Sequence, residues 1–106
     1  MSQELDIILK RYVDDVHGLY GSLLKSVILY GSYARGDFRL DSDIDIMILV
    51  DLSDEEIRKK GHVLSDITFD YNFDSDLHIM PIVKNAGHFN KWIRAYPFYN
   101  NIKKKE

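Results

Sequence analysis

The residues best suited to chemistry lie together in one stretch, Leu29–Val50, which reads LYGSYARGDFRLDSDIDIMILV. A glycine and a serine, Gly31 and Ser32, follow an apolar segment, and ten residues separate Ser32 from Asp43. Glycine lets backbone amides approach an anion closely, and a serine hydroxyl followed by a helical turn can donate to a phosphate. The pair therefore predicts a phosphate-binding turn.

Two aspartates, Asp43 and Asp45, open the apolar run that follows this turn. Side chains two apart on a strand share one face, so the carboxylates would lie about 6 Å apart and repel by about 3 kcal/mol at an effective dielectric near 20. The alternating isoleucines Ile44, Ile46 and Ile48 would fill the opposite, buried face. A hard cation offsets the repulsion, and Mg²⁺ commonly takes one or two carboxylates together with water and phosphate oxygens. The spacing therefore predicts a divalent cation held against a phosphate.

The order of these motifs resembles the nucleotidyltransferase superfamily, which includes DNA polymerase β and the aminoglycoside nucleotidyltransferases. The fuller strings GSYARG at 31–36 and SDID at 42–45 are similar to its smallest members, the minimal nucleotidyltransferases that are often paired with HEPN-domain toxins. The resemblance extends roughly from Ile7 to Lys105. It implies a polymerase β-like α/β (α+β) core, in which a small mixed β-sheet carries helices packed on one face. We expect one domain over residues 1–106, with 100–106 as a flexible tail.

The same resemblance implies the reaction and the residues that carry it. An acceptor oxygen attacks the α-phosphate of ATP, pyrophosphate leaves, and two Mg²⁺ ions clamp the attacking and departing oxygens. The expected catalytic residues and metal ligands are Asp43, Asp45 and Asp76, and the expected nucleotide-binding residues are Gly31, Ser32, Arg35 and Ser42.

The third carboxylate has three candidates. In the resembled family it comes from a strand beside the Asp-x-Asp strand, and Asp76 is preferred because Leu77 and Ile79 would then face the core. Asp74 is the second candidate and Asp70 the third.

Two further assignments keep an alternative. Arg35 either contacts phosphate oxygens, which suit a guanidinium group, or forms a structural pair with Asp37 or Asp41. Ser42 either orients the carboxylate of Asp43 through a hydrogen bond or serves only the turn.

The elements that must position these residues follow from hydrophobic periodicity and from capping signals. Ser53 and Glu56 form a capping box, Asn85 is placed to cap a last helix, and Pro81 indicates a sheet edge or a bulge. The predicted helices are Gln3–Tyr20, Asp54–Phe69 and Ala86 to about Ala95, with a helical turn at Tyr33–Gly36, and the predicted strands are Lys25–Tyr30, Asp43–Val50 and Asp74–Val83.

The composition limits the function classes. The chain has 106 residues, a net charge of -3 and no cysteine, which excludes disulfides and thiolate metal sites. The negative net charge argues against nonspecific electrostatic binding of a nucleic-acid backbone, and hence against a templated polymerase. No apolar run reaches the length of a membrane span, and the N-terminus does not look like a signal peptide, so we expect a cytoplasmic protein.

The chain is close to a catalytic core alone, so its acceptor pocket is expected to be completed by another protein or by a second copy. The minimal family implies an antitoxin that transfers AMP from ATP to a tyrosine of a HEPN toxin. The alternatives are a non-catalytic antitoxin that only binds its toxin, and a small-molecule enzyme of the aminoglycoside type. An aromatic group near the C-terminus, formed by Trp92, Tyr96, Phe98 and Tyr99, is a candidate partner surface for a hetero-oligomer or a homodimer.

Overall fold

The computed structural model describes residues 3–31 and 42–92. Its elements in chain order are α1 (Gln3–Tyr20), a 3-10 turn η1 (Gly21–Leu23), β1 (Leu24–Tyr30), β2 (Ile44–Val50), α3 (Asp54–Ser75), β3 (Ile79–Asn85) and α4 (Ala86–Trp92).

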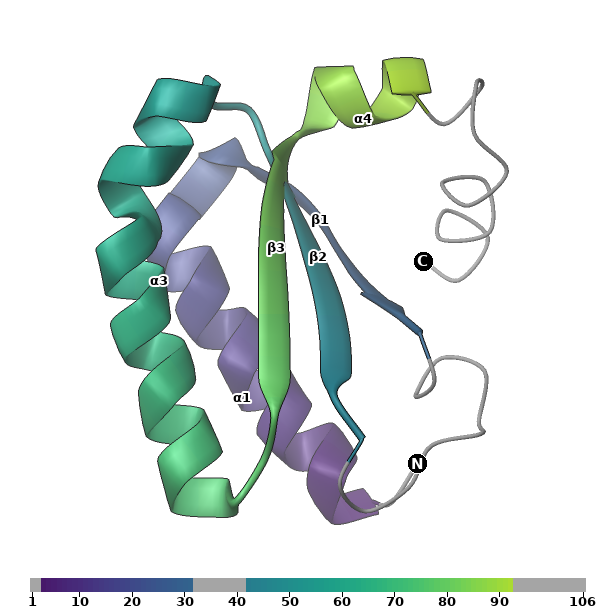
Figure 1. The fold of residues 1–106 in the computed structure, drawn as a ribbon, viewed down its shortest axis with the longest axis vertical. Coiled ribbons are helices and arrows are strands. Elements are labelled where there is room, and N and C mark those ends of the chain that lie inside the picture. Colours follow the sequence, from purple (N-terminus) through teal and green to yellow (C-terminus); the bar gives the residue numbers. More distant parts are fainter. Residues whose placement is uncertain (1–2, 32–41, 93–106) are drawn as a thin grey trace.

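The described strands form one mixed sheet in the order β1-β2-β3 (Figure 1). β1 pairs antiparallel with β2, placing Leu29 opposite Ile46, and β3 pairs parallel with β2, placing Ile79 opposite Ile44. Parallel neighbours require a long crossover, and α3 supplies it. The α/β class and the small mixed sheet predicted from the sequence are therefore confirmed.

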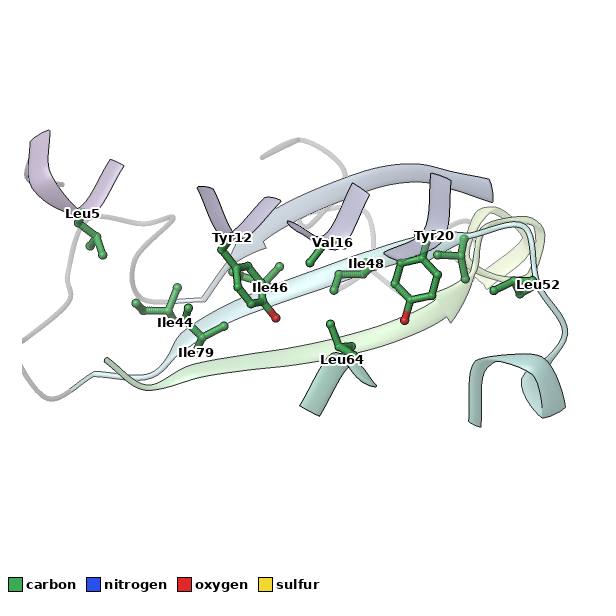
Figure 2. Packing of buried hydrophobic residues seen from close by; sticks show 11 residues of the cluster. Leu5, Tyr12, Val16, Tyr20, Ile44, Ile46, Ile48, Leu52, Leu64 and Ile79 are labelled. Carbon is green, nitrogen blue, oxygen red and sulfur yellow. The ribbon is translucent and has the colours of Figure 1, made fainter. Parts of the chain in front are cut away.

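The main core lies between one face of the sheet and the two long helices. Alternate residues of β2, such as Ile44 and Ile48, are fully buried against α1 and α3. Figure 2 shows Tyr12 and Val16 of α1 and Leu64 of α3 directed toward these strand residues. Each fully buried aliphatic side chain contributes about 1.5–3 kcal/mol, so this face supplies most of the driving force for folding.

The opposite face of the sheet carries a smaller apolar cluster. Ile28 of β1 and Met47 and Leu49 of β2 are buried there together with Phe89 of α4. The helices α1 and α3 thus cover one face, as predicted, and α4 adds a cover over part of the other. Asp45 has the same parity along β2 as Met47 and Leu49, which places the predicted site on this second face.

Polar contacts join α1 to α3 within the core layer. The hydroxyls of Tyr12 and Thr68 lie 2.7 Å apart, and the rings of Tyr12 and Tyr71 meet edge-on with centroids 5.3 Å apart. The Tyr71 hydroxyl donates to Asp15 at 2.6 Å. Burial, and then this hydrogen bond, raise the pKa of Tyr71 to about 12.

The helix caps predicted from the sequence are confirmed. Ser53 and Glu56 form the reciprocal capping box: the Glu56 amide donates to Ser53 Oγ at 3.2 Å, and the Ser53 amide donates to the Glu56 carboxylate at 3.1 Å. Asn85 accepts the His88 amide at 2.8 Å and also donates to the Leu52 carbonyl at 2.8 Å. Asn85 therefore both starts α4 and ties the far ends of β2 and β3 together.

Two boundaries differ from the prediction by five residues or more. α3 continues to Ser75 rather than ending at Phe69, and the third strand begins at Ile79 rather than at Asp74. The side chain of Asn72 sets the start of the strand, because its Nδ2 donates to the Ile79 carbonyl at 3.2 Å and its Oδ1 accepts the Ile79 amide at 2.8 Å. This clamp holds the last turn of α3 against the first residue of β3.

Candidate active site

The centre of the candidate site is the contact between Gly31 and Asp45. Gly31 follows β1 with a φ of +78°, a conformation that glycine adopts readily and other residues avoid. A Cβ built on Gly31 would overlap Oδ2 of Asp45 and lie 3.2 Å from its Cγ. The half-buried Asp45 carboxylate therefore lies directly against the glycine turn, as the motif order predicts.

The antiparallel pairing of β1 with β2 explains this proximity. Tyr30 is the register partner of Asp45, so the residue after Tyr30 must turn beside that aspartate. Asp43 is exposed and lies immediately before β2, two residues from Asp45. The Ile44 amide donates to the His78 carbonyl at 2.8 Å, which fixes the start of β2 beside the start of β3.

Asp76 lies at this same edge, but not on a strand. It is the C-terminal cap of α3, exposed, with φ 52° and ψ 47°, and its amide donates to the Asn72 carbonyl. The other two candidates, Asp74 and Asp70, are exposed residues of α3 itself. The expectation that the third carboxylate comes from within a strand is therefore corrected for all three. The catalytic role of Asp76 stays a prediction.

The remaining predicted site residues are only partly described. Ser42 is half-buried and directly precedes Asp43. Ser32 and Arg35 lie outside the described residues, as do the Tyr33–Gly36 turn and the aromatic residues beyond Trp92.

Two neighbours of Asp45 were missed by sequence reasoning. Tyr30 pairs with Asp45 from β1, and Met80 pairs with it from β3, so all three share the second face of the sheet. Tyr30 packs against the smaller apolar cluster, whereas Met80 and Ile82 are 51% and 41% exposed. The alternating side chains of residues 78–82 indicated which residues share a face of β3. They could not show which residue lies beside Asp45, because that depends on the register between β2 and β3.

The donor set at this edge fits a hard divalent cation in part. Asp43 and Asp45 offer the one or two carboxylates that Mg²⁺ commonly takes from a protein, and the glycine turn lies directly against the carboxylate of Asp45. Within residues 3–31 and 42–92, no three aspartate, glutamate or histidine side chains gather closely enough to hold one metal ion. The described residues thus provide two carboxylates, and phosphate oxygens would be needed to complete the ligand set.

A hollow of about 430 Å³ lies elsewhere and does not belong to this site. It opens between α1 and β1 on the helix-covered face, since Ile46 contributes to it and Asp45 does not. Among the described helices, none combines the length and apolar character needed to cross a bilayer.

A glycine turn against a strand aspartate, with a second aspartate just before that strand, is the arrangement expected of an α/β nucleotidyltransferase domain. Comparison with known families agrees. The nucleotidyltransferase domain family matches residues 9–105, and the chain belongs to this family.

Three relatives from Methanocaldococcus jannaschii are similar to this chain. "Putative protein adenylyltransferase MJ0141" is 35% identical over 80 residues, covering 76% of this chain and 79% of the relative. "Putative protein adenylyltransferase MJ0604" is 31% identical over 102 residues, covering 89% and 86%. "Putative protein adenylyltransferase MJ1305" is 30% identical over 79 residues, covering 74% and 54%. No solved structure matches the chain significantly.

Proposed function

We propose that this protein is a Mg²⁺-dependent protein adenylyltransferase that transfers AMP from ATP to a tyrosine of a HEPN-domain toxin and so acts as an antitoxin. Family membership supports nucleotidyl transfer, and the names of the relatives support a protein acceptor. The HEPN target rests on the likeness of residues 31–36 and 42–45 to the minimal nucleotidyltransferases.

The observation that carries the proposal is the contact between the Gly31 turn and the Asp45 carboxylate. A phosphate-binding turn and a metal-binding carboxylate must lie close together if one triphosphate is to contact both.

Each predicted site residue then has a separate role in the reaction. Gly31 and Ser32 would bind the β- and γ-phosphates, while Asp43 and Asp45 would hold Mg²⁺, which supplies charge neutralisation when bound. Asp76 would join these ligands after its exposed side chain turns toward them. The acceptor hydroxyl forms a bond to the α-phosphorus as the bond to the pyrophosphate oxygen breaks. Asp76 at the same edge can accept the hydroxyl proton.

The test uses the whole chain with MgCl₂, ATP labelled at the α-phosphate and a HEPN protein encoded beside it. We expect label on the HEPN protein, and none when the label is on the γ-phosphate. Asp43→Asn and Asp45→Asn should each lower transfer about 100-fold or more. Asp51→Asn is the matched control, because Asp51 is an exposed aspartate at the opposite end of β2.

Three outcomes would overturn the proposal. Absence of label on a HEPN protein that still binds would remove the catalytic claim. Full neutralisation of the toxin by the Asp43→Asn protein would instead favour the non-catalytic antitoxin. Transfer to an aminoglycoside without any protein partner would identify a small-molecule enzyme.

A further inference from the structure

The second half of α3 exposes two large aromatic side chains that belong to neither apolar cluster of the core. Phe69 and Phe73 are 66% and 76% exposed, and their rings stack with centroids 6.0 Å apart at an interplanar angle of 18°. We call these two residues the aromatic patch. Together they expose on the order of 300 Å², which is comparable to the largest apolar patch of a typical monomer.

Acidic residues surround the aromatic patch. Between Gly61 and Leu77 the chain carries four aspartates and neither lysine nor arginine; these aspartates, here called the acidic flank, are Asp66, Asp70, Asp74 and Asp76. Asp66 stands three residues before Phe69 and Asp70 three before Phe73, the spacing at which helical side chains are neighbours. All four are exposed.

The acidic flank does not serve the stability of α3. The last turn contains no basic residue, and aspartates near a helix C-terminus oppose the negative end of the helix dipole. Arg11 of α1 lies near part of this charge, since it lines a hollow of about 240 Å³ together with Asp70 and Asp74. The surface nevertheless keeps a net negative charge around an apolar centre.

The position of this surface relates it to the candidate active site. The C-terminal end of α3 lies at the same end of the molecule as the starts of β2 and β3 (Figure 1). Asp76 ends α3, and the connection from it leads to His78, whose carbonyl accepts the Ile44 amide next to Asp43. The aromatic patch and the candidate site thus lie at the same end of the molecule but on opposite faces of the sheet. A protein bound on the aromatic patch would have to extend around this end of the sheet to present an acceptor side chain to Asp43 and Asp45.

We propose that the aromatic patch and the acidic flank form the docking surface for the protein acceptor, through an acceptor helix whose apolar residues are flanked by lysine or arginine. Aromatic side chains are enriched at the centres of protein interfaces, and charge complementarity guides orientation and association rate. This inference rests on the proposed protein adenylyltransferase function, and it adds where the acceptor binds and what chemistry its binding segment has.

The first experiment tests docking without any catalysis. A fluorescein-labelled 18-residue amphipathic peptide of leucine and lysine is titrated with the full chain in the absence of ATP, beside a leucine and glutamate peptide of the same pattern. We expect only the lysine peptide to bind, with an affinity that falls as NaCl is raised. Phe69→Ser combined with Phe73→Ser, and separately Asp66→Asn combined with Asp70→Asn, should each weaken binding about tenfold or more.

Val63→Ser is the matched control, because Val63 is an exposed apolar residue of the same helix that lies about 120° around its axis from Phe69. This variant should bind the peptide as the unchanged chain does. Equal binding by the double phenylalanine variant, or equal binding of the glutamate peptide, would overturn the proposal. A dimer that the double phenylalanine variant converts to a monomer would also overturn it, since the occupant would then be a second copy.

The second experiment separates docking from chemistry. In the labelling assay with the HEPN protein, the double phenylalanine variant should raise KM for the protein acceptor about tenfold and leave kcat and KM for ATP unchanged. A fall in kcat at unchanged KM for the acceptor would contradict a docking role. Failure of every labelling reaction would count against the proposed function alone, because peptide binding is measured independently.

Discussion

The Gly31→Ala substitution should damage the protein through two effects that can be separated. The first is the backbone: an alanine held near a φ of +78° costs about 1–2 kcal/mol relative to glycine. The second is the new Cβ, which overlaps Oδ2 of Asp45 and lies 3.2 Å from its Cγ, so the carboxylate must move. Forcing a methyl group into an occupied space typically costs a further 1–3 kcal/mol, so we expect a total loss of about 2–5 kcal/mol.

Gly21→Ala is the matched control for the backbone effect. Gly21 also has a positive φ, +60°, but a Cβ there would meet nothing within 4 Å. We therefore expect a loss of only about 1–2 kcal/mol, the same as the first effect alone. Urea denaturation followed by circular dichroism gives both free energies of unfolding, and the difference between the two variants measures the displacement of Asp45.

A double-mutant cycle assigns that difference to the carboxylate. Asp45→Ala removes Oδ2 and Cγ and leaves a Cβ contact of 3.4 Å, which is an ordinary van der Waals distance. In this background Gly31→Ala should cost no more than Gly21→Ala, a coupling of about 1–3 kcal/mol. Binding of the fluorescent analogue TNP-ATP with MgCl₂ should weaken about tenfold or more in Gly31→Ala, equivalent to about 1.4 kcal/mol, and remain unchanged in Gly21→Ala. Equal stability and equal nucleotide affinity of the two alanine variants would refute the reasoning.

Three further predictions concern the core and a cap. Because Thr68 Oγ1 donates to the Leu64 carbonyl at 2.8 Å, the Tyr12 hydroxyl must donate to Thr68. Urea denaturation should show that Tyr12→Phe lowers the free energy of unfolding by about 1 kcal/mol and that Thr68→Val lowers it by about 1–3 kcal/mol. The double variant should lose less than the sum of the two. The Tyr20 hydroxyl is buried with no hydrogen-bond partner among the described residues, so Tyr20→Phe should be neutral or stabilising by up to about 1 kcal/mol, and a clear loss of stability would contradict this. Hydrogen bonds from the Ser53 backbone and side chain lower the pKa of Glu56, so the stability that they contribute is present above pH 4.5 and is lost as the pH falls through the lowered pKa. The difference in urea midpoint between the unchanged chain and Glu56→Gln should therefore shrink as the pH falls through that range. A difference that persists at low pH would contradict this prediction.

Local signals in the sequence predicted those parts of the fold that depend on neighbouring residues. The capping box of Ser53 and Glu56 is confirmed because both partners lie within one helical turn. Asn85 is confirmed as a cap for the same reason, through its bond to the His88 amide. The alternation of isoleucines along β2 correctly predicted which face is buried against α1 and α3, since alternate residues of a strand share one face. It did not predict that Met47 and Leu49 on the other face are buried as well, because α4 is what covers them.

The end of α3 was not predictable in this way because contacts distant in sequence decide it. Tyr71 packs on Tyr12 and bonds Asp15, 56 residues earlier, which stabilises helix beyond Phe69. Residues 74–76 are polar and fit the surface of a helix as well as the polar face of a strand, so parity alone could not distinguish the two. The clamp of Asn72 on Ile79 then decides where the strand begins.

The strand directions, rather than the exact strand boundaries, place the predicted site residues close to one another. β1 runs antiparallel to β2 and β3 runs parallel to it, so the end of β1 and the starts of β2 and β3 all lie at one edge of the sheet (Figure 1). Gly31, Asp43, Asp45 and Asp76 each lie on or within three residues of one of these three points. The position of Asp76 on a helix cap rather than on a strand therefore changes its side-chain direction without moving it to another edge. The amides of Asp76 and Leu77 both donate to the Asn72 carbonyl and fix the backbone of this cap. The exposed side chain of Asp76 can therefore turn toward a bound nucleotide by a change of rotamer, without any rearrangement of the sheet.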